Sequence, residues 1–251
     1  MAVLYDFVLR LAFGLALAMA VTSPRQVTSG YYRNHSYVLL GLFVLAFMIA
    51  FGQHAQVSYG LALAGGVFSY AASVAWLYER PRGGVLLLGC TAGLALWAAC
   101  HGMQATTVDL PPLAAILQRL EPATAGMLLG STIAAMFLGH WYLNTPTMQL
   151  APLRKLIAIM AVAILLRAGV CGIGLWCQWS SGPLDQFQIM FLALRWLAGI
   201  AIPLLLVWMT WKTLDIPNTQ SATGILYVAV ITIFTGELAA QLLSTGTTYP
   251  L

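Results

Sequence analysis

Long apolar runs separated by short polar breaks dominate the chain. A helix needs roughly 20 apolar residues to cross a hydrocarbon layer, since it rises ~1.5 Å per residue and satisfies its own backbone hydrogen bonds. Clusters of proline, glycine, serine and asparagine divide the chain into runs of about this length. These runs predict eight membrane-spanning helices at Val3–Val21, Tyr37–His54, Val57–Tyr78, Val85–Ala105, Ala123–Leu143, Leu156–Trp179, Phe187–Trp211 and Thr223–Ser244.

Three places in this pattern depart from a simple series of eight straight spans. Only residues 53–56 separate the second run from the third, so a seven-span chain is the alternative. The segment Leu113–Leu120 predicts a short amphipathic turn in the membrane interface, with Arg119 and Glu121 toward water. Pro203 is the one proline deep within a predicted span and is a candidate kink.

Composition sets the class of protein. Hydrophobic residues make up 61% of the chain and charged residues only 7%, whereas soluble domains are about one quarter charged. We therefore predict an all-α, polytopic membrane bundle that forms a single transmembrane domain over residues 1–251, with no soluble domain. The four cysteines lie in apolar runs without metal-binding spacing and are expected to be structural. Glycines in Gly60–Gly66 and Gly169–Gly174 predict close helix contacts.

Basic residues predict the orientation, because short cytoplasmic loops are enriched in lysine and arginine. The odd-numbered connections and their margins hold seven basic residues and the even-numbered ones hold only Arg119. The odd connections are therefore expected in the cytoplasm and both termini outside, in a cell (inner) membrane. Asp6 and Arg10 argue for a retained first span and are expected to form a local ion pair. The seven basic residues are Arg25, Arg33, Arg80, Arg82, Arg154, Lys155 and Lys212.

Three ionisable residues fall near the middle of predicted spans: Arg167, Arg195 and Glu237. Each charge there costs roughly 2.5 to 3.5 kcal/mol on insertion scales and needs a partner. The simplest interpretation is an ion pair of Arg195 with Glu237 that orders the bundle without chemistry. Two guanidiniums and one carboxylate leave a net positive charge, which favours a carboxylate, a haem propionate or a quinol-derived anion. Gln241 lies one turn beyond Glu237 and completes this predicted buried polar site, in which Glu237 is also a candidate proton carrier.

Four histidines fall into two layers of the predicted bundle. His54 and His101 lie toward the outer surface, and His35 and His140 lie toward the cytoplasmic surface. The two members of each layer are on different helices, as ligation of a b-type haem by two imidazoles requires. They are candidate haem ligands, and no other metal site is predicted. Ordinary interfacial or hydrogen-bonded histidine is the alternative.

The segment at the end of the fifth span gathers His140, Trp141, Tyr142 and Asn144. A quinone needs flat apolar walls and one or two hydrogen-bond donors for its carbonyl oxygens, and these residue types supply them. The cluster is therefore a candidate quinone pocket. A lipid headgroup against the aromatic belt would use the same residues.

The sequence lacks the motifs of several classes of enzyme. The chain has no phosphate-binding Gly-Lys-Ser/Thr loop, no HExxH and no GxSxG, so neither a nucleotide-driven pump nor a catalytic residue is predicted. The leading hypothesis is an integral membrane subunit of a respiratory or photosynthetic electron-transfer complex, interacting with quinone or haem b. Such a chain would be at most a quinone-site or non-catalytic subunit of an oxidoreductase, and it would need partner subunits. The alternatives are a secondary transporter or channel for a small anion or proton and a purely structural accessory subunit. The bilayer is an expected partner, whereas nucleic acid and nucleotide are not.

Overall fold

The computed structural model describes residues 1–101, 111–145, 148–182, 184–216 and 218–251. Residues 102–105 of the predicted fourth span, and the polar break at 106–110, lie outside this range. Within it, eight helices are long and apolar enough to cross a membrane, which makes the chain a multi-pass membrane protein and confirms the all-α prediction. Helices α2 and α3 are separate, so eight spans hold rather than seven. The helices are α1 (Ala2–Val21), α2 (Ser29–Gly52), α3 (Gln56–Leu77), α4 (Pro81–His101), α5 (Pro112–Asn144), α6 (Ala151–Ser181), α7 (Gln186–Trp196), η1 (Leu197–Ala201), α8 (Ile202–Asp215) and α9 (Thr219–Ser244).

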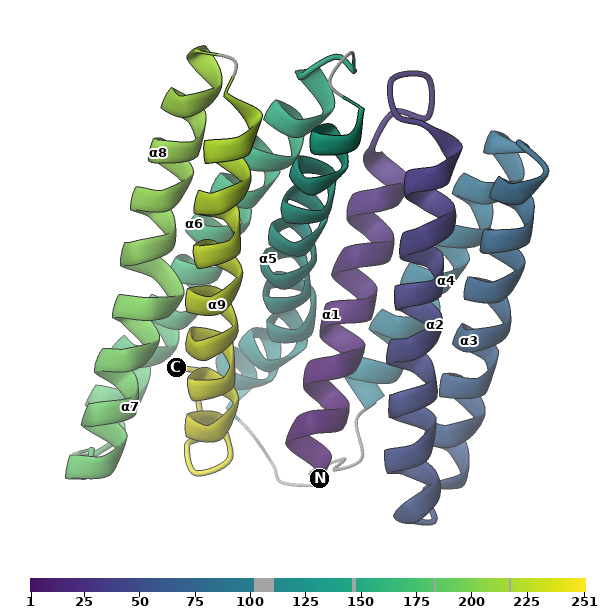
Figure 1. Cartoon of the computed structure of the whole chain (residues 1–251). Coiled ribbons are helices and arrows are strands. Elements are labelled where there is room, and N and C mark those ends of the chain that lie inside the picture. Colours follow the sequence, from purple (N-terminus) through teal and green to yellow (C-terminus); the bar gives the residue numbers. More distant parts are fainter. Residues whose placement is uncertain (102–110, 146–147, 183, 217) are drawn as a thin grey trace.

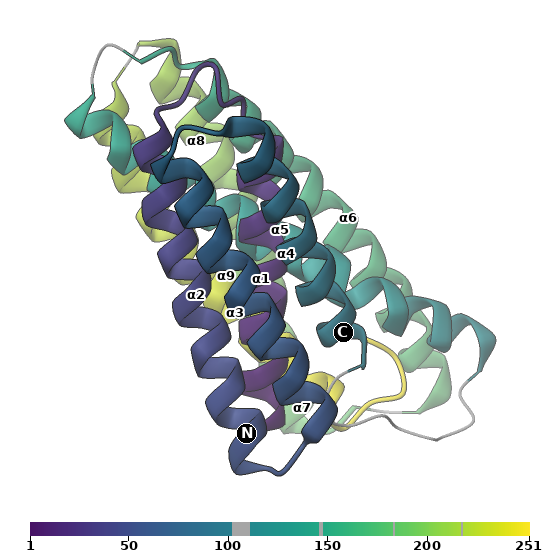
Figure 2. The same cartoon turned by 90° about the vertical axis from the view of Figure 1, so that its right-hand side faces the viewer.

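The helices form two groups that meet at α1 and α5. In the first group, α1 and α3 each pack against both α2 and α4, which leaves α2 and α4 at opposite corners. In the second group, α5 packs against α6 and α9, and α8 packs against the same two helices. Both marked chain ends lie in the lower part of Figure 1, and we call this end of the bundle the termini side and the opposite end the far side. The view in Figure 2 places α7 at the termini side as well.

Helix α5 differs most from expectation. The predicted interfacial turn at Leu113–Leu120 is wrong, because these residues are the first turns of a continuous helix of 33 residues. Pro122 lies inside this helix, and the buried residues Ala114, Leu117 and Glu121 lie on one helical face. Arg119 is exposed as expected, but Glu121 is only 6% exposed and does not face water. The amphipathic pattern therefore belongs to a long span whose buried face includes a carboxylate.

Glycines allow α1 and α5 to touch. A Cβ atom on Gly130 would lie 1.8 Å from the carbonyl carbon of Gly14, and one on Gly14 would lie 1.6 Å from the Gly126 carbonyl oxygen. Gly126 and Gly130 have the GxxxG spacing that brings transmembrane backbones together. The two glycine patterns expected to do so contain close contacts at one position each, because Gly65 lies against the Phe43 ring of α2 and Gly174 against the backbone of Pro250. Gly60 and Gly169, in the same patterns, have no neighbouring atom within 4 Å of an added Cβ. The closest helix contact thus lies on α5, outside those patterns.

The seventh span changes helical geometry in its middle. Helices α7 and α8 are joined by η1, a π-helical turn that ends just before Pro203. Proline lacks an N–H and its ring clashes with the carbonyl four residues earlier, here that of Gly199, so a wider turn relieves the clash. Gly199 also touches Gly236 of α9, where an added Cβ would meet the Gly199 Cα at 2.3 Å. This contact holds the seventh and eighth spans together beside the buried charges.

Candidate functional site

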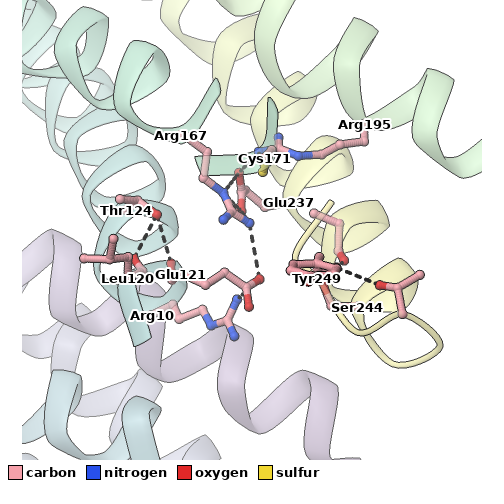
Figure 3. A network of polar contacts seen from close by, with 12 residues as sticks. Arg10, Leu120, Glu121, Thr124, Arg167, Cys171, Arg195, Glu237, Ser244 and Tyr249 are labelled. Carbon is pink, nitrogen blue, oxygen red and sulfur yellow. Dashed lines mark hydrogen bonds and ion pairs between the residues drawn. The ribbon is translucent and has the colours of Figure 1, made fainter. Parts of the chain in front are cut away.

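Five charged side chains form a continuous ion-paired row through the bundle, drawn in Figure 3. Its links are Arg10 to Glu121 at 3.0 Å, Glu121 to Arg167 at 3.4 Å, Arg167 to Glu237 at 3.1 Å and Glu237 to Arg195 at 3.1 Å. The residues come from α1, α5, α6, α9 and α7. We call this row the charged ladder. Each carboxylate in it lies between two guanidiniums.

The charged ladder is shielded from the surroundings of the bundle. Arg167, Arg195 and Glu237 are 0% exposed, and Arg10 and Glu121 are 8% and 6% exposed. A single charge at this depth would be very costly, and alternating signs offset that cost because each charge has an opposite charge in contact. Five of the eight spans supply a member. The charged ladder therefore ties both helix groups together.

Small residues next to the charged ladder allow the helices that carry it to approach one another closely. Gly236 precedes Glu237 on α9, and Gly199 follows Arg195 by one turn. At the other end, a Cβ on Gly126 would lie 2.7 Å from the backbone oxygen of Arg10. Close backbone approach at these crossings brings side chains of neighbouring spans within ion-pair distance.

The sequence identified part of the charged ladder. The predicted ion pair of Arg195 with Glu237 is present, and Arg167 binds the same carboxylate. The expected local pair of Asp6 with Arg10 is wrong, because Arg10 pairs with Glu121 of α5. Sequence reasoning missed Arg10 and Glu121 as members of the charged ladder. A signal for Glu121 was present, because it follows Ala114 and Leu117 at the spacing of one buried helical face.

Several buried polar atoms around the charged ladder have no hydrogen-bond partner. Gln241 is 5% exposed, and both atoms of its amide group are unpaired. Four guanidinium nitrogens are also unpaired, so N–H donors outnumber acceptors at this place. These atoms are Asp6 Oδ1, Arg10 Nε, Arg167 Nη1, Arg195 Nε, Arg195 Nη1, Gln241 Nε2 and Gln241 Oε1.

A polar cavity of about 220 Å³ reaches the charged ladder. Arg10 and Glu121 line it from the charged ladder, and Asp6 and Gln241 line it beside them. The start of α1, the end of α9 and the segment after α9 also border the cavity, so it lies toward the termini side. We call it the termini-side cavity. Its remaining lining residues are Ala2, Val3, Ala99, Cys100, Gln118, Pro122, Ser244, Thr245, Thr247, Tyr249 and Pro250.

Residues 245–251 fold back over the termini-side cavity. Gln118 of α5 donates a hydrogen bond to the backbone oxygen of Thr248 at 3.1 Å. The backbone oxygen of Pro250 lies against Gly174 of α6, where a Cβ would come within 1.9 Å of it. Tyr249 lines the cavity together with Arg10 and Glu121, and Figure 3 labels all three residues. This segment thus forms one wall of the cavity and is held by contacts to α5 and α6.

The four histidines occupy different surroundings. His54, in the turn after α2, and His101, at the end of α4, are both exposed, on helices at opposite corners of the first group. His35 is 8% exposed; its Nδ1 donates to the Tyr31 backbone oxygen at 2.6 Å, and its ring stacks on Phe137. His140 is exposed. Among the described residues, no group of three or more histidine, cysteine, aspartate or glutamate side chains is placed to hold a metal ion.

The candidate quinone pocket at the end of α5 contains side chains that already have partners. Trp141 Nε1 donates to the hydroxyl oxygen of Thr28 at 2.9 Å. The Tyr142 hydroxyl donates to the backbone oxygen of Gln149. His140 and Asn144 are exposed. The two bonds connect the end of α5 with the segments that precede α2 and α6.

Comparison with known protein families, curated proteins and solved structures found no match.

Proposed function

We propose that the chain is a secondary transporter or channel that binds a small anion in the termini-side cavity. The observation that carries this proposal is a polar cavity lined by Arg10 and Gln241, each of which has a buried N–H donor without a partner. The unpaired nitrogens of Arg167 and Arg195 lie further along the charged ladder. Ionisable residues within membrane spans are the usual marks of a solute or ion pathway.

The chemistry of the unpaired atoms favours an anion over a neutral or basic solute. A guanidinium offers five N–H donors and no acceptor, so an oxyanion or a carboxylate supplies what the arginines lack. The five residues of the charged ladder carry three positive and two negative charges, which leaves a net charge of +1. A bound monovalent anion would balance it.

The size of the cavity limits the anion. Pockets for drug-sized ligands measure roughly 300 to 1,000 Å³. At about 220 Å³, the termini-side cavity suits an ion of a few heavy atoms, such as nitrate or a short carboxylate. A mobile proton on Glu237 has less support, because its two oxygens contact Arg167 and Arg195 and protonation would remove the charge that both ion pairs need.

The distribution of basic residues gives the proposal a direction. With the odd-numbered connections in the cytoplasm of a cell with an inner membrane, the termini-side cavity opens to the non-cytoplasmic side. Single cysteines at Arg80 and Arg119, in a cysteine-free chain, test this orientation with a membrane-impermeant thiol reagent on intact cells. Labelling at position 119 alone is expected, and labelling at position 80 alone would reverse the orientation.

Uptake into proteoliposomes tests the proposal. The purified chain is expected to take up nitrate, chloride or lactate faster than protein-free vesicles. The variant Gln241→Leu should lose most of this uptake, since it removes a polar group that lines the cavity. Tyr32→Phe is the matched control, because it also removes a buried polar group but lies at the far side. Wild-type vesicles that accumulate none of the three anions would overturn the proposal.

An electron-transfer subunit is the second candidate, and one observation favours it. The Nδ1–H of His35 is fixed by a backbone oxygen, which leaves Nε2 as the ligand atom and resembles the outer hydrogen bond of metal-binding histidines. In this role the chain would bind haem b or quinone and assemble with partner subunits. A reduced-minus-oxidised absorption spectrum of the purified protein tests the haem: a b-type band that His35→Ala removes supports it, and a flat spectrum removes it.

A purely structural accessory subunit is the outcome if both tests are negative. In that case the charged ladder would act only as an ordering network across five spans.

A further inference from the structure

We propose that Asp6 is the proton-coupling residue of the termini-side cavity, so that an anion enters together with one proton. This inference rests on the proposed anion transport and adds a second, coupled substrate to it.

Asp6 is half-buried, and it differs from the buried Glu121 and Glu237 in having no cation in contact. Glu121 and Glu237 each bridge two guanidiniums, whereas Asp6 makes no ion pair among the described residues. Its Oδ1 is buried without a hydrogen-bond partner, and the side chain lines the cavity. A carboxyl group in this position can gain or lose a proton without breaking an ion pair.

The groups that share the cavity with Asp6 come from every element around it. Arg10 lies one turn away on α1 and is engaged with Glu121 of α5. The other polar or titratable groups are Cys100 of α4, Gln118 of α5, Gln241 and Ser244 of α9, and Thr245, Thr247 and Tyr249 of the following segment. Among the described residues that line the cavity, Arg10 is the single cation. Asp6 and Glu121 therefore both depend on its charge when both are ionised.

Charge balance couples the proton to the anion. With Asp6 ionised, the six groups sum to zero, since three arginines face Glu121, Glu237 and Asp6. An anion would then bring the buried site to −1, which is unfavourable in a low-dielectric interior. With Asp6 protonated, the site carries +1 before binding and zero after it.

The coupled step is a binding equilibrium without covalent chemistry. One proton from the non-cytoplasmic solution binds an Asp6 carboxylate oxygen, and one monovalent anion binds the unpaired donors beside it. The carboxyl O–H can also donate a hydrogen bond to the anion. Release of both gives an electroneutral transport cycle with one proton per anion.

Nitrate uptake measured together with internal acidification tests this inference. Wild-type proteoliposomes containing a pH-sensitive dye are placed in an inward nitrate gradient, because nitrate does not cross lipid as a neutral acid. We expect the interior to acidify by one proton per nitrate. Uptake should fall up to about tenfold per pH unit as Asp6 loses its proton, and an imposed membrane potential should not change the rate.

Two variants separate coupling from transport. Asp6→Asn keeps a neutral side chain of the same shape, and its nitrate uptake should become independent of pH, lose the proton and respond to membrane potential. Glu79→Gln, at an exposed carboxylate outside the spans, should behave as the wild type.

The outcomes distinguish the two proposals. Wild-type nitrate uptake without acidification, or an Asp6→Asn variant with the wild-type pH dependence, overturns the coupling and leaves anion transport standing. Absence of uptake for nitrate, chloride and lactate in the wild type overturns transport, and the coupling with it. The wild-type ratio of protons to nitrate decides the question even where Asp6→Asn does not fold.

Discussion

Two buried polar regions in this bundle satisfy their polar atoms very differently. One is the charged ladder beside the termini-side cavity. The other lies at the far side and joins α2, α3 and α5 through close ring contacts, such as Tyr32 with Trp76 at 4.1 Å and His35 with Phe137 at 4.4 Å. We call it the aromatic cluster, and it consists of Tyr31, Tyr32, His35, Trp76, Phe137 and Trp141.

In the aromatic cluster, polar groups donate mainly to backbone oxygens within the chain. Tyr31 reaches the oxygen of Ala134 at 3.2 Å, and Tyr32 reaches that of Thr22 at 3.0 Å. Trp76 Nε1 is the unpaired atom found there, whereas seven unpaired atoms lie around the charged ladder. Buried polar groups in stable structures are nearly always paired, so unpaired ones that gather at a cavity point to water or a ligand. This difference supports a structural role for the aromatic cluster and the proposed binding role for the termini-side cavity.

Removing a carboxylate from the charged ladder should have the largest effect. In Glu237→Gln, Arg167 and Arg195 lose their shared counterion while remaining buried, and breaking such a pair costs roughly 3 to 5 kcal/mol. We expect this loss in unfolding free energy in detergent micelles, measured by denaturant titration. The exposed Glu79→Gln is the control and should be unchanged. An unfolding free energy equal to that of the wild type would mean that the charged ladder does not hold the spans together.

Overpacking the crossing that positions the charged ladder should come next. In Gly130→Ala, the new methyl group meets the backbone of Gly14, which cannot move aside as a side chain could, so we expect a loss of about 3 kcal/mol. Gly60→Ala is the matched control in open space and should be neutral or slightly stabilising. The same denaturant titration compares the two variants. Equal stabilities would contradict the close contact of α1 with α5.

These two regions also explain what could be read from the sequence. Eight spans followed from the length of the apolar runs, because the lipid layer fixes the length of a spanning helix. Arg167, Arg195 and Glu237 stood out because each interrupts such a run. Glu121 did not, since it lies at the edge of a run beside Pro122, where a helix end and a buried turn have the same pattern. Only the packing of α5 against α1 distinguishes them.

The ion-pair partner of Arg10 could not be predicted from the sequence either. Asp6 and Arg10 are four residues apart, and local spacing favours their pairing. Tertiary packing overrides it, because Gly14, Gly126 and Gly130 bring α5 close enough for Glu121 to bind Arg10 at 3.0 Å. The termini-side cavity depends on the packing of α1, α4, α5 and α9 and on residues 245–251, so no single stretch of sequence indicates it.

Removing one hydroxyl from the aromatic cluster should have a moderate effect. Tyr32→Phe keeps the stacking on Trp76 and removes the bond to the backbone oxygen of Thr22, which leaves that acceptor unpaired. The expected loss is about 1 to 2 kcal/mol in unfolding free energy. Anion uptake should be unchanged. Lost uptake in a folded Tyr32→Phe protein would show that the far side takes part in transport, so that the aromatic cluster would no longer be purely structural.

The smallest effect on stability is expected at Gln241, where the sign of the effect separates a binding residue from a structural one. Both amide atoms of this residue are buried without partners, so the folded protein bears the cost of their desolvation and gains no hydrogen bond in return. Gln241→Leu replaces the amide by an apolar group of similar size, and we expect the empty protein to be more stable by about 1 kcal/mol.

Nitrate should raise the unfolding temperature of the wild type but not that of the variant, since a ligand stabilises only the state that binds it. Residues of functional sites often reduce the stability of the folded protein. If Gln241 lowers the stability of the empty protein and is also required for stabilisation by nitrate, it belongs to a binding site. If Gln241→Leu instead destabilises the empty protein by more than Tyr32→Phe does, the amide has structural partners and the termini-side cavity is not a binding site.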